Sequence, residues 1–110
     1  MTKQDDTVEF IKLVQKVRNS QKTFYPQLTF KSNSYQFSLM RIYENQLDNY
    51  DTKNVVEQEF VNRVKTMRKS QKNYEEKRTI ETLRICKAHQ RYADDDLRYL
   101  FFNYCSNKLE

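Results

Sequence analysis

The sequence contains no glycine and a single proline, Pro26. Glycine enters the left-handed region of backbone conformation without steric cost, so tight hairpin turns and phosphate-binding loops depend on it. A chain of 110 residues without glycine is poorly suited to a many-turned β fold. Long helices joined by short polar loops need few such turns, so the sequence predicts an all-α protein.

Cysteines are few, and long apolar runs are absent. Cys86 and Cys105 are the only cysteines and stand 19 residues apart, which on one helix is about 28 Å and too far for a disulfide. With no apolar run of membrane length and no signal peptide, we expect a cytoplasmic protein that does not enter a membrane. Leu109 and Glu110 resemble a purification-tag remnant, so the expected single domain covers residues 1–108.

The polarity of the chain raises the question of disorder. Charged residues make up 32% of the sequence, and the mean hydropathy is −1.02. However, eight tyrosines and seven phenylalanines supply large side chains for burial. We therefore expect a folded domain with a thin, aromatic core.

An internal repeat is the clearest signal. Residues 9–24 align with residues 59–74 without gaps, and seven of the 16 positions are identical. The identical pairs are Glu9/Glu59, Phe10/Phe60, Val14/Val64, Arg18/Arg68, Ser20/Ser70, Gln21/Gln71 and Lys22/Lys72. A weaker alignment places residues 40–48 on residues 86–94. The pattern predicts two tandem helix-hairpin units, at about 6–50 and 55–96.

Hydrophobic periodicity places the helices. Val8, Ile11, Val14, Val17 and Phe24 form one stripe of a first helix over about 6–25, which Pro26 ends. A second helix is expected from Asn33 to about residue 50, a third from Asp51 or Asn54, and a fourth from Thr79 with a stripe that begins at Ile80. The predicted architecture is an antiparallel four-helix bundle. Asp94, Asp95 and Asp96 are weak helix formers, so the apolar tail 97–106 is expected as a short fifth helix.

Gln21 and Gln71 fall on the apolar stripes of the first and third helices. A buried amide costs stability unless it is paired, so the two are expected to bond to one another across the repeat. In that case changing both to Leu should keep or raise stability while making the packing less unique. The alternative is that the two amides line a ligand groove.

A basic stripe offers a second candidate site. Lys65, Arg68, Lys69 and Lys72 have the spacing of one helical face, and Arg18 and Lys22 repeat part of it on the first helix. Such a face beside exposed tyrosines is able to hold phosphates and stack bases. The net charge of +5 is modest for a nucleic-acid binder, however. A solvated face interleaved with glutamates is the favoured interpretation.

The apolar tail offers an interface. Leu97, Leu100, Phe101 and Tyr104 must pack either on the bundle or on a partner. His89 is the only histidine and has no ligand-like neighbours in the sequence, and three consecutive aspartates point in different directions on a helix. Neither pattern indicates a metal, and no catalytic motif or cofactor-binding motif is present. We therefore expect a protein that is not an enzyme and uses no cofactor.

The segment from Met67 to Tyr74, with the pattern Met-Arg-x-x-Gln-Lys-x-Tyr, resembles small uncharacterised helical proteins of gut bacteria and their mobile elements. That resemblance implies a helical hairpin and no known activity. From the apolar tail and the basic stripe, rather than from this resemblance, we expect one of two functions. The first is a protein-interaction module that binds a protein partner or a second copy of itself. The second is an accessory nucleic-acid binder that uses the basic stripe.

Overall fold

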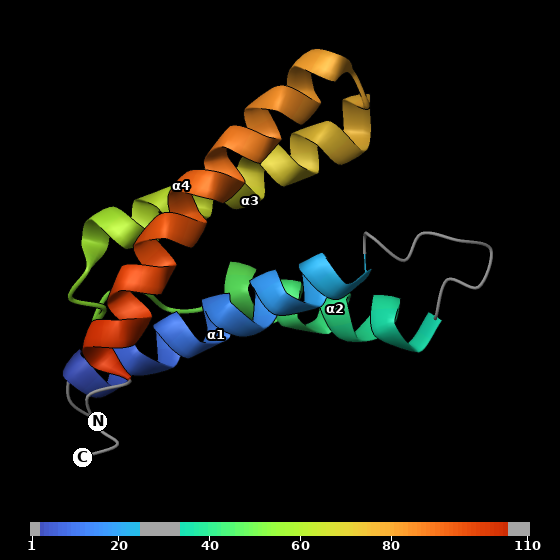
Figure 1. Ribbon diagram of the computed structural model, residues 1–110. Helices are drawn as coiled ribbons and strands as arrows, with labels where there is room; N and C mark the ends of the chain where they lie inside the picture. Colours follow the sequence, from blue (N-terminus) through green and yellow to red (C-terminus); the bar gives the residue numbers. More distant parts are fainter. Residues whose placement is uncertain (1–2, 25–33, 106–110) are drawn as a thin grey trace.

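The computed structural model describes residues 3–24 and 34–105. This part of the chain forms four α-helices and no strand: α1 Lys3–Phe24, α2 Ser34–Asp48, α3 Gln58–Lys77 and α4 Ile80–Tyr104 (Figure 1). The predicted all-α class is confirmed. The predicted start of the second helix at Asn33 and the predicted break at Pro26 lie outside the described residues.

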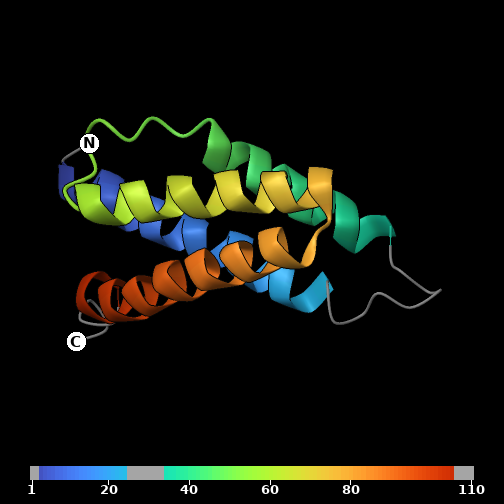
Figure 2. The ribbon, with the colours of Figure 1, turned by 90° about the horizontal axis from the view of Figure 1, so that it is seen from above.

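The helices form two antiparallel hairpins, α1 with α2 and α3 with α4, and α1 also packs against α4. The hairpins lie close together where α1 begins and α4 ends, and they diverge toward the turn between α3 and α4 (Figure 1). Seen from above, one hairpin lies across the other along most of its length (Figure 2). The result is the predicted four-helix bundle, with hairpins that are splayed at one end.

The main apolar cluster of the core lies at the end of the bundle where α1 begins and α4 ends. Phe10 of α1 makes an edge-on ring contact with Phe60 of α3 and a tilted contact with Tyr50. The buried residues of this cluster are Phe10, Ile11, Val14, Val17, Leu47, Val55, Phe60, Val61, Val64, Leu97 and Leu100. They come from all four helices and from the connection between α2 and α3, so burial of this apolar surface holds the two hairpins together.

The connection between α2 and α3 differs from the prediction. The third helix begins at Gln58 rather than after Asp51 or Asn54, and its N-cap residue, Glu57, makes no side-chain cap. Val55 is buried in the core, and the Val56 N–H donates to the Thr7 hydroxyl at 2.8 Å. These contacts hold the connection 51–57, which contains a turn at residues 53–54, against α1, so helix formation starts later.

The turn between α3 and α4 is short and well capped. Arg78 takes the left-handed conformation at φ 53° and ψ 40°, and its N–H donates to the Tyr74 carbonyl at 2.7 Å. Thr79 caps α4 as predicted: its hydroxyl accepts from the Thr82 N–H, and the Thr82 hydroxyl accepts from the Thr79 N–H. The chain therefore makes this turn without glycine, with an arginine in the position that glycine usually takes.

The predicted break at Asp94–Asp96 and the predicted fifth helix are wrong, because α4 is continuous from Ile80 to Tyr104. Asp94 pairs with Arg18 of α1, and Asp96 pairs with Arg63 of α3. These ion pairs with neighbouring helices outweigh the low helix propensity of aspartate. Ile80, expected on the buried stripe, is 77% exposed because it lies at the open end of the bundle.

Candidate functional site

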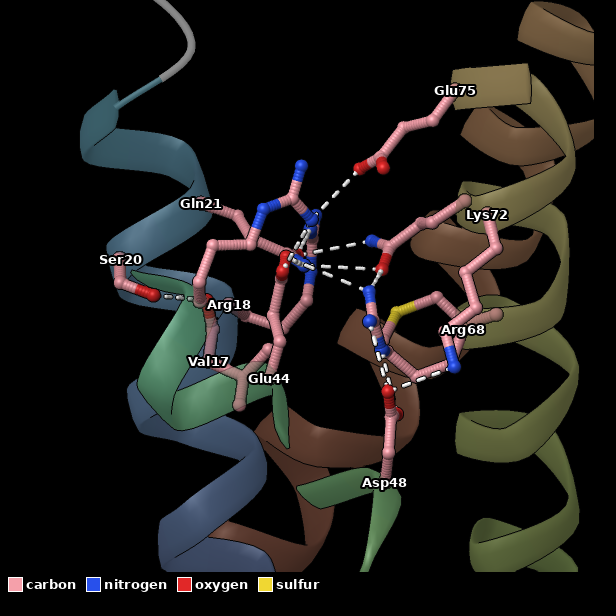
Figure 3. A network of polar contacts seen from close by, with 12 residues as sticks. Val17, Arg18, Ser20, Gln21, Glu44, Asp48, Arg68, Lys72 and Glu75 are labelled. Atoms are coloured by element: carbon pink, nitrogen blue, oxygen red, sulfur yellow. Dashed lines mark hydrogen bonds and ion pairs between the residues drawn. The ribbon is translucent and has the colours of Figure 1, made fainter. Parts of the chain in front are cut away.

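A buried polar network joins the two hairpins, and its centre is a pair of amides (Figure 3). Gln21 of α1 and Gln71 of α3 exchange two hydrogen bonds, each Nε2 donating to the other residue's Oε1 at 3.0 Å. The structure thus brings together the two glutamines that the sequence placed on the apolar stripes. Both are buried, and every hydrogen-bonding atom of this pair has a partner.

Each glutamine is bonded to an arginine of its own helix. Arg18 Nη1 donates to Gln21 Oε1 at 2.6 Å, and Arg68 Nη1 donates to Gln71 Oε1 at 2.6 Å. Each arginine then reaches the other hairpin with its remaining nitrogens. Arg18 makes a two-pronged contact with Asp94 at 2.7 and 2.9 Å, and Arg68 makes the same contact with Asp48 at 2.9 and 3.1 Å.

Corresponding residues of the two aligned segments make matching contacts. Lys22 approaches Asp94 at 3.2 Å and Lys72 approaches Asp48 at 2.9 Å. Asp48 and Asp94 are themselves aligned in the weaker half of the repeat. Each hairpin therefore gives an arginine to the other and accepts one from it, as in the self-complementary interface of a twofold dimer. The repeat itself stays a prediction from the sequence.

Glu44 breaks the symmetry of the network. It is 1% exposed, and its carboxylate accepts from Gln21 Nε2 at 2.6 Å and from Arg41 Nη1 at 2.8 Å. Arg68 Nη1 lies 3.5 Å away. The aligned position in α4 is Gln90, which is uncharged and only partly buried. Glu44 was not predicted from the sequence, because hydrophobic periodicity marks apolar positions and does not reveal a buried carboxylate.

The electrostatics of the network follow from burial and pairing. Burial raises the pKa of Asp48, but the hydrogen bonds and charges of Arg68 and Lys72 lower it more, so this pKa lies below its usual range. The pKa of Asp94 is lowered in the same way by Arg18 and Lys22. Within the described residues, no buried side-chain nitrogen or oxygen is left without a partner, and no acidic, histidine or cysteine cluster has the makings of a metal site. The paired charges and amides of this network join the two hairpins.

The six basic residues of the predicted stripe lie in two separate grooves, one for each helix. Lys65, Arg68, Lys69 and Lys72 line a groove between α2 and α3, whereas Arg18 and Lys22 line a separate groove between α1 and α4. Arg18 and Arg68 are only 6% exposed and are held in their ion pairs. Both guanidinium groups pair with carboxylates of the facing hairpin, so these two arginines are not exposed cations of the grooves. The exposed cations of the α2–α3 groove are Lys65, Lys69 and Lys72.

The predicted apolar interface is largely core. Leu97 and Leu100 are 4% and 6% exposed, and Phe101 packs against the same cluster. The Tyr104 hydroxyl donates to Glu57 at 2.6 Å, a bond that raises the pKa of Tyr104 to about 12. These four residues thus serve the monomer. In the same tail, Tyr99 and Phe102 remain 69% and 63% exposed.

The outer face of α4 carries a regular pattern that sequence analysis missed. Three arginines at seven-residue spacing are each followed by a large apolar residue: Arg84-Ile85, Arg91-Tyr92 and Arg98-Tyr99. All six residues are exposed. The seven-residue spacing was the available signal, but the buried stripe of the same helix obscured it.

The remaining candidates are structural. His89 is partly buried and packs edge-on against Tyr92. Cys86 is buried, and burial raises the pKa of its thiol, which opposes reactivity.

The comparisons with known proteins give no relative. The chain matches no protein-family model, and neither the curated proteins nor the solved structures give a match. The resemblance to helical proteins of gut bacteria therefore stays a prediction. Among the described helices, none has the length and the apolar composition to cross a membrane.

Proposed function

We propose that this protein is a non-enzymatic interaction module that binds another protein through the outer face of α4. The observation that carries the proposal is the alternation of exposed arginines with exposed Ile85, Tyr92 and Tyr99 along this helix. Tyrosine, phenylalanine and arginine are the residue types enriched at the centres of protein interfaces. In Figure 2, α4 runs along one edge of the molecule.

The distribution of exposed apolar residues supports this choice of surface. Among the described residues, nine large hydrophobic side chains are exposed, and five of them belong to α4. These five are Ile80, Ile85, Tyr92, Tyr99 and Phe102. The helices α1 and α3 contribute none. Since single exposed apolar residues are common but aligned ones are not, the face of α4 has the character of a binding surface.

The buried network supports a non-enzymatic role. Its arginines, carboxylates and amides are paired with each other from both hairpins, which is the arrangement of a structural element. A catalytic group needs an open side that faces a substrate. The two unpaired cysteines are consistent with a reducing compartment, so a cytoplasmic location belongs to the same proposal.

Site-specific photocrosslinking in the source organism tests the proposal. A photoreactive phenylalanine analogue replaces Tyr99 or Tyr92 on α4, and matched variants carry it at exposed Lys12 of α1 or Glu59 of α3. We expect one discrete protein adduct from both α4 positions and from neither control. The adducted protein, once purified, should bind the purified wild-type chain and lose binding to the Tyr92→Ser/Tyr99→Ser variant. Adducts that are absent, or equal at all four positions, would contradict the proposal.

A second candidate is nucleic-acid binding through the α2–α3 groove. The observation that favours it is a difference between the two grooves: Lys65 and Lys69 stand where the α1–α4 groove has Gln15 and Asn19. The chain therefore supplies its own control. Labelled single-stranded DNA, duplex DNA and RNA are titrated at low and physiological salt, because phosphate contacts weaken steeply with salt.

The groove swap decides this candidate. Lys65→Gln/Lys69→Asn gives the α2–α3 groove the residues of its counterpart, and Gln15→Lys/Asn19→Lys makes the reverse change. If the groove binds phosphates, the first variant should make the plot of log binding constant against log salt concentration less steep. The change in slope should correspond to the loss of roughly one to two phosphate contacts. The second variant should leave the original site unchanged. No binding at low salt, or equal effects of both variants, removes the candidate.

A further inference from the structure

We infer that the partner of α4 is an amphipathic helix whose apolar stripe is flanked by acidic residues. This inference rests on the proposed function and names the chemistry of the partner. It follows from the spacing of the apolar side chains on α4, from the arginines beside them, and from the poor fit of a second copy of the chain.

The spacing matches another helix. Ile85, Tyr92 and Tyr99 repeat every seven residues, which is about 10.5 Å along the helix axis. Ala88, Asp95 and Phe102 lie three residues after Ile85, Tyr92 and Tyr99, so the face has the three-and-four spacing of a coiled-coil seam with one acidic residue, Asp95, at its middle. A partner helix with the same seven-residue repeat stays in register with this face over its whole length.

The flanking charge selects the partner. From Arg84 to Phe102 the exposed charged residues of α4 are four basic and one acidic, a net charge of +3. They are Arg84, Lys87, Arg91, Arg98 and Asp95. Within the described residues, none of the three arginines forms an ion pair or a side-chain hydrogen bond, so their guanidinium groups are available. Acidic residues beside the apolar stripe of a partner would meet these arginines, as flanking charges set partner choice in coiled coils.

A second copy of the chain fits this face poorly. In an antiparallel pair about a twofold axis, the arginine flank of one α4 meets the arginine flank of the other, so Arg91 faces its own copy. In a parallel pair the arginines meet the opposite flank, where the one acidic side chain, Asp96, already pairs with Arg63 at 2.8 Å. Like charges across a helical seam oppose association, so the arginines select against self-pairing and for an acidic partner.

Two synthetic peptides of about three heptads test the inference. One carries leucine at the seam positions and glutamate at the flanking positions, and the other carries lysine in place of glutamate. Mutual repulsion of the flanking charges keeps each peptide monomeric. Binding to the purified full chain is followed by fluorescence anisotropy at physiological salt. We expect the glutamate peptide to bind at least about tenfold more tightly than the lysine peptide.

Two charge-reversal variants with the same net charge locate the binding surface. Arg84→Glu/Arg91→Glu/Arg98→Glu changes α4, and Lys65→Glu/Lys69→Glu/Lys77→Glu changes the α2–α3 groove and the end of α3, at exposed lysines outside the buried network. The affinity of the α4 variant for the glutamate peptide should fall by about tenfold or more, and its affinity for the lysine peptide should rise. The groove variant should bind both peptides with the affinities of the wild type. Helical circular dichroism of both variants checks that they fold.

Each remaining outcome is decisive. Equal loss in both variants shows unspecific attraction by net charge and overturns the inference. The same variants are also titrated with RNA. If the wild type binds RNA but no peptide, and the α4 variant loses the RNA, then nucleic acid occupies this face and the inference is overturned. Suppose that photocrosslinking at Tyr99 captures a protein that binds the purified chain in solution, while the glutamate and lysine peptides bind equally. In that case the proposed function stands, and the inference that the partner is an acidic helix is overturned.

Discussion

Gln21 and Gln71 come from different hairpins and exchange two hydrogen bonds of 3.0 Å in the buried centre of the molecule. Each amide also accepts a bond from an arginine, and Gln21 donates to Glu44 as well. The pair is therefore the junction of a charged network rather than an isolated amide contact. This changes what its removal is expected to do.

Changing Gln21 and Gln71 together to Leu should destabilise the protein. Taken alone, an amide pair is replaceable by apolar side chains at little cost. Here the change leaves two buried guanidinium nitrogens and Glu44 short of partners, and we expect the free energy of unfolding to fall by about 3 kcal/mol. Urea unfolding at neutral pH measures it, with Gln46→Leu on the exposed side of α2 as control. Unchanged stability of the double variant would show that the network is dispensable.

Arg68→Met should cost more stability than Arg18→Met. Both changes leave a partly buried aspartate with only an exposed lysine as its partner, and each should lower the free energy of unfolding by about 2–4 kcal/mol. Arg68 also lies 3.5 Å from the buried Glu44, so its loss leaves a second carboxylate less compensated. Adding Asp94→Leu to Arg18→Met should recover much of the loss, because no unpaired charge then remains at that site. The reverse order of the two arginines would contradict the assigned role of Glu44.

Acid should unfold the protein as the two aspartates of the network are protonated. The pKa values of Asp48 and Asp94 are lower in the folded state than their ordinary value of 3.8. Their pairing therefore stabilises the fold above that value and is lost as the pH falls through the folded-state pKa values. Urea unfolding from neutral pH down to the acid range should show stability falling below about pH 4. The Asp48→Asn/Asp94→Asn variant should be less stable at neutral pH and change less with acid, and an equally steep acid loss in that variant would refute the assignment.

Tyr104 should titrate apart from the other tyrosines. Its bond to Glu57 raises its pKa to about 12 from an ordinary value of 10.0. The folded state thus favours the protonated hydroxyl, and this stabilisation is complete below pH 10 and lost as the pH rises toward 12. Burial also raises the pKa of Tyr50, so tyrosinate absorbance should show late titration whose last step Tyr104→Phe removes. Tyr99→Phe removes an exposed tyrosine and is the control, and a last step that persists in Tyr104→Phe would count against the bond to Glu57.

Sequence periodicity predicted the helical class and much of the inner surface, since the first-helix stripe from Val8 to Phe24 is buried as expected. The position of Gln21 and Gln71 on such stripes also pointed to their contact. Periodicity of a single helix does not tell which distant charge it meets, however. The pairing of Arg18 with Asp94 crosses 76 positions of the chain, and only the packing of α1 on α4 defines it.

The tail from Leu97 to Tyr104 shows a second limit of sequence reasoning. Apolar residues occur on all sides of this segment, so the sequence alone does not separate the side that faces the core from the side that faces outward. The structure buries Leu97 and Leu100 against α1 and α3 and leaves Tyr99 and Phe102 on the surface. The residues predicted as an interface therefore belong mainly to the core, and the surface proposed for a partner lies on the other side of the same segment.

The central claim is that the inner face of α4 belongs to the fold and the outer face to a partner. The free energy of urea unfolding of two matched double variants tests it most directly. Leu97→Ala/Leu100→Ala removes buried core and should cost roughly 4 kcal/mol or more. Tyr99→Ser/Phe102→Ser removes exposed apolar surface and should stay within about 1 kcal/mol of the wild type. If the outer pair costs as much stability as the inner pair, both faces of α4 serve the fold and no surface is left for a partner.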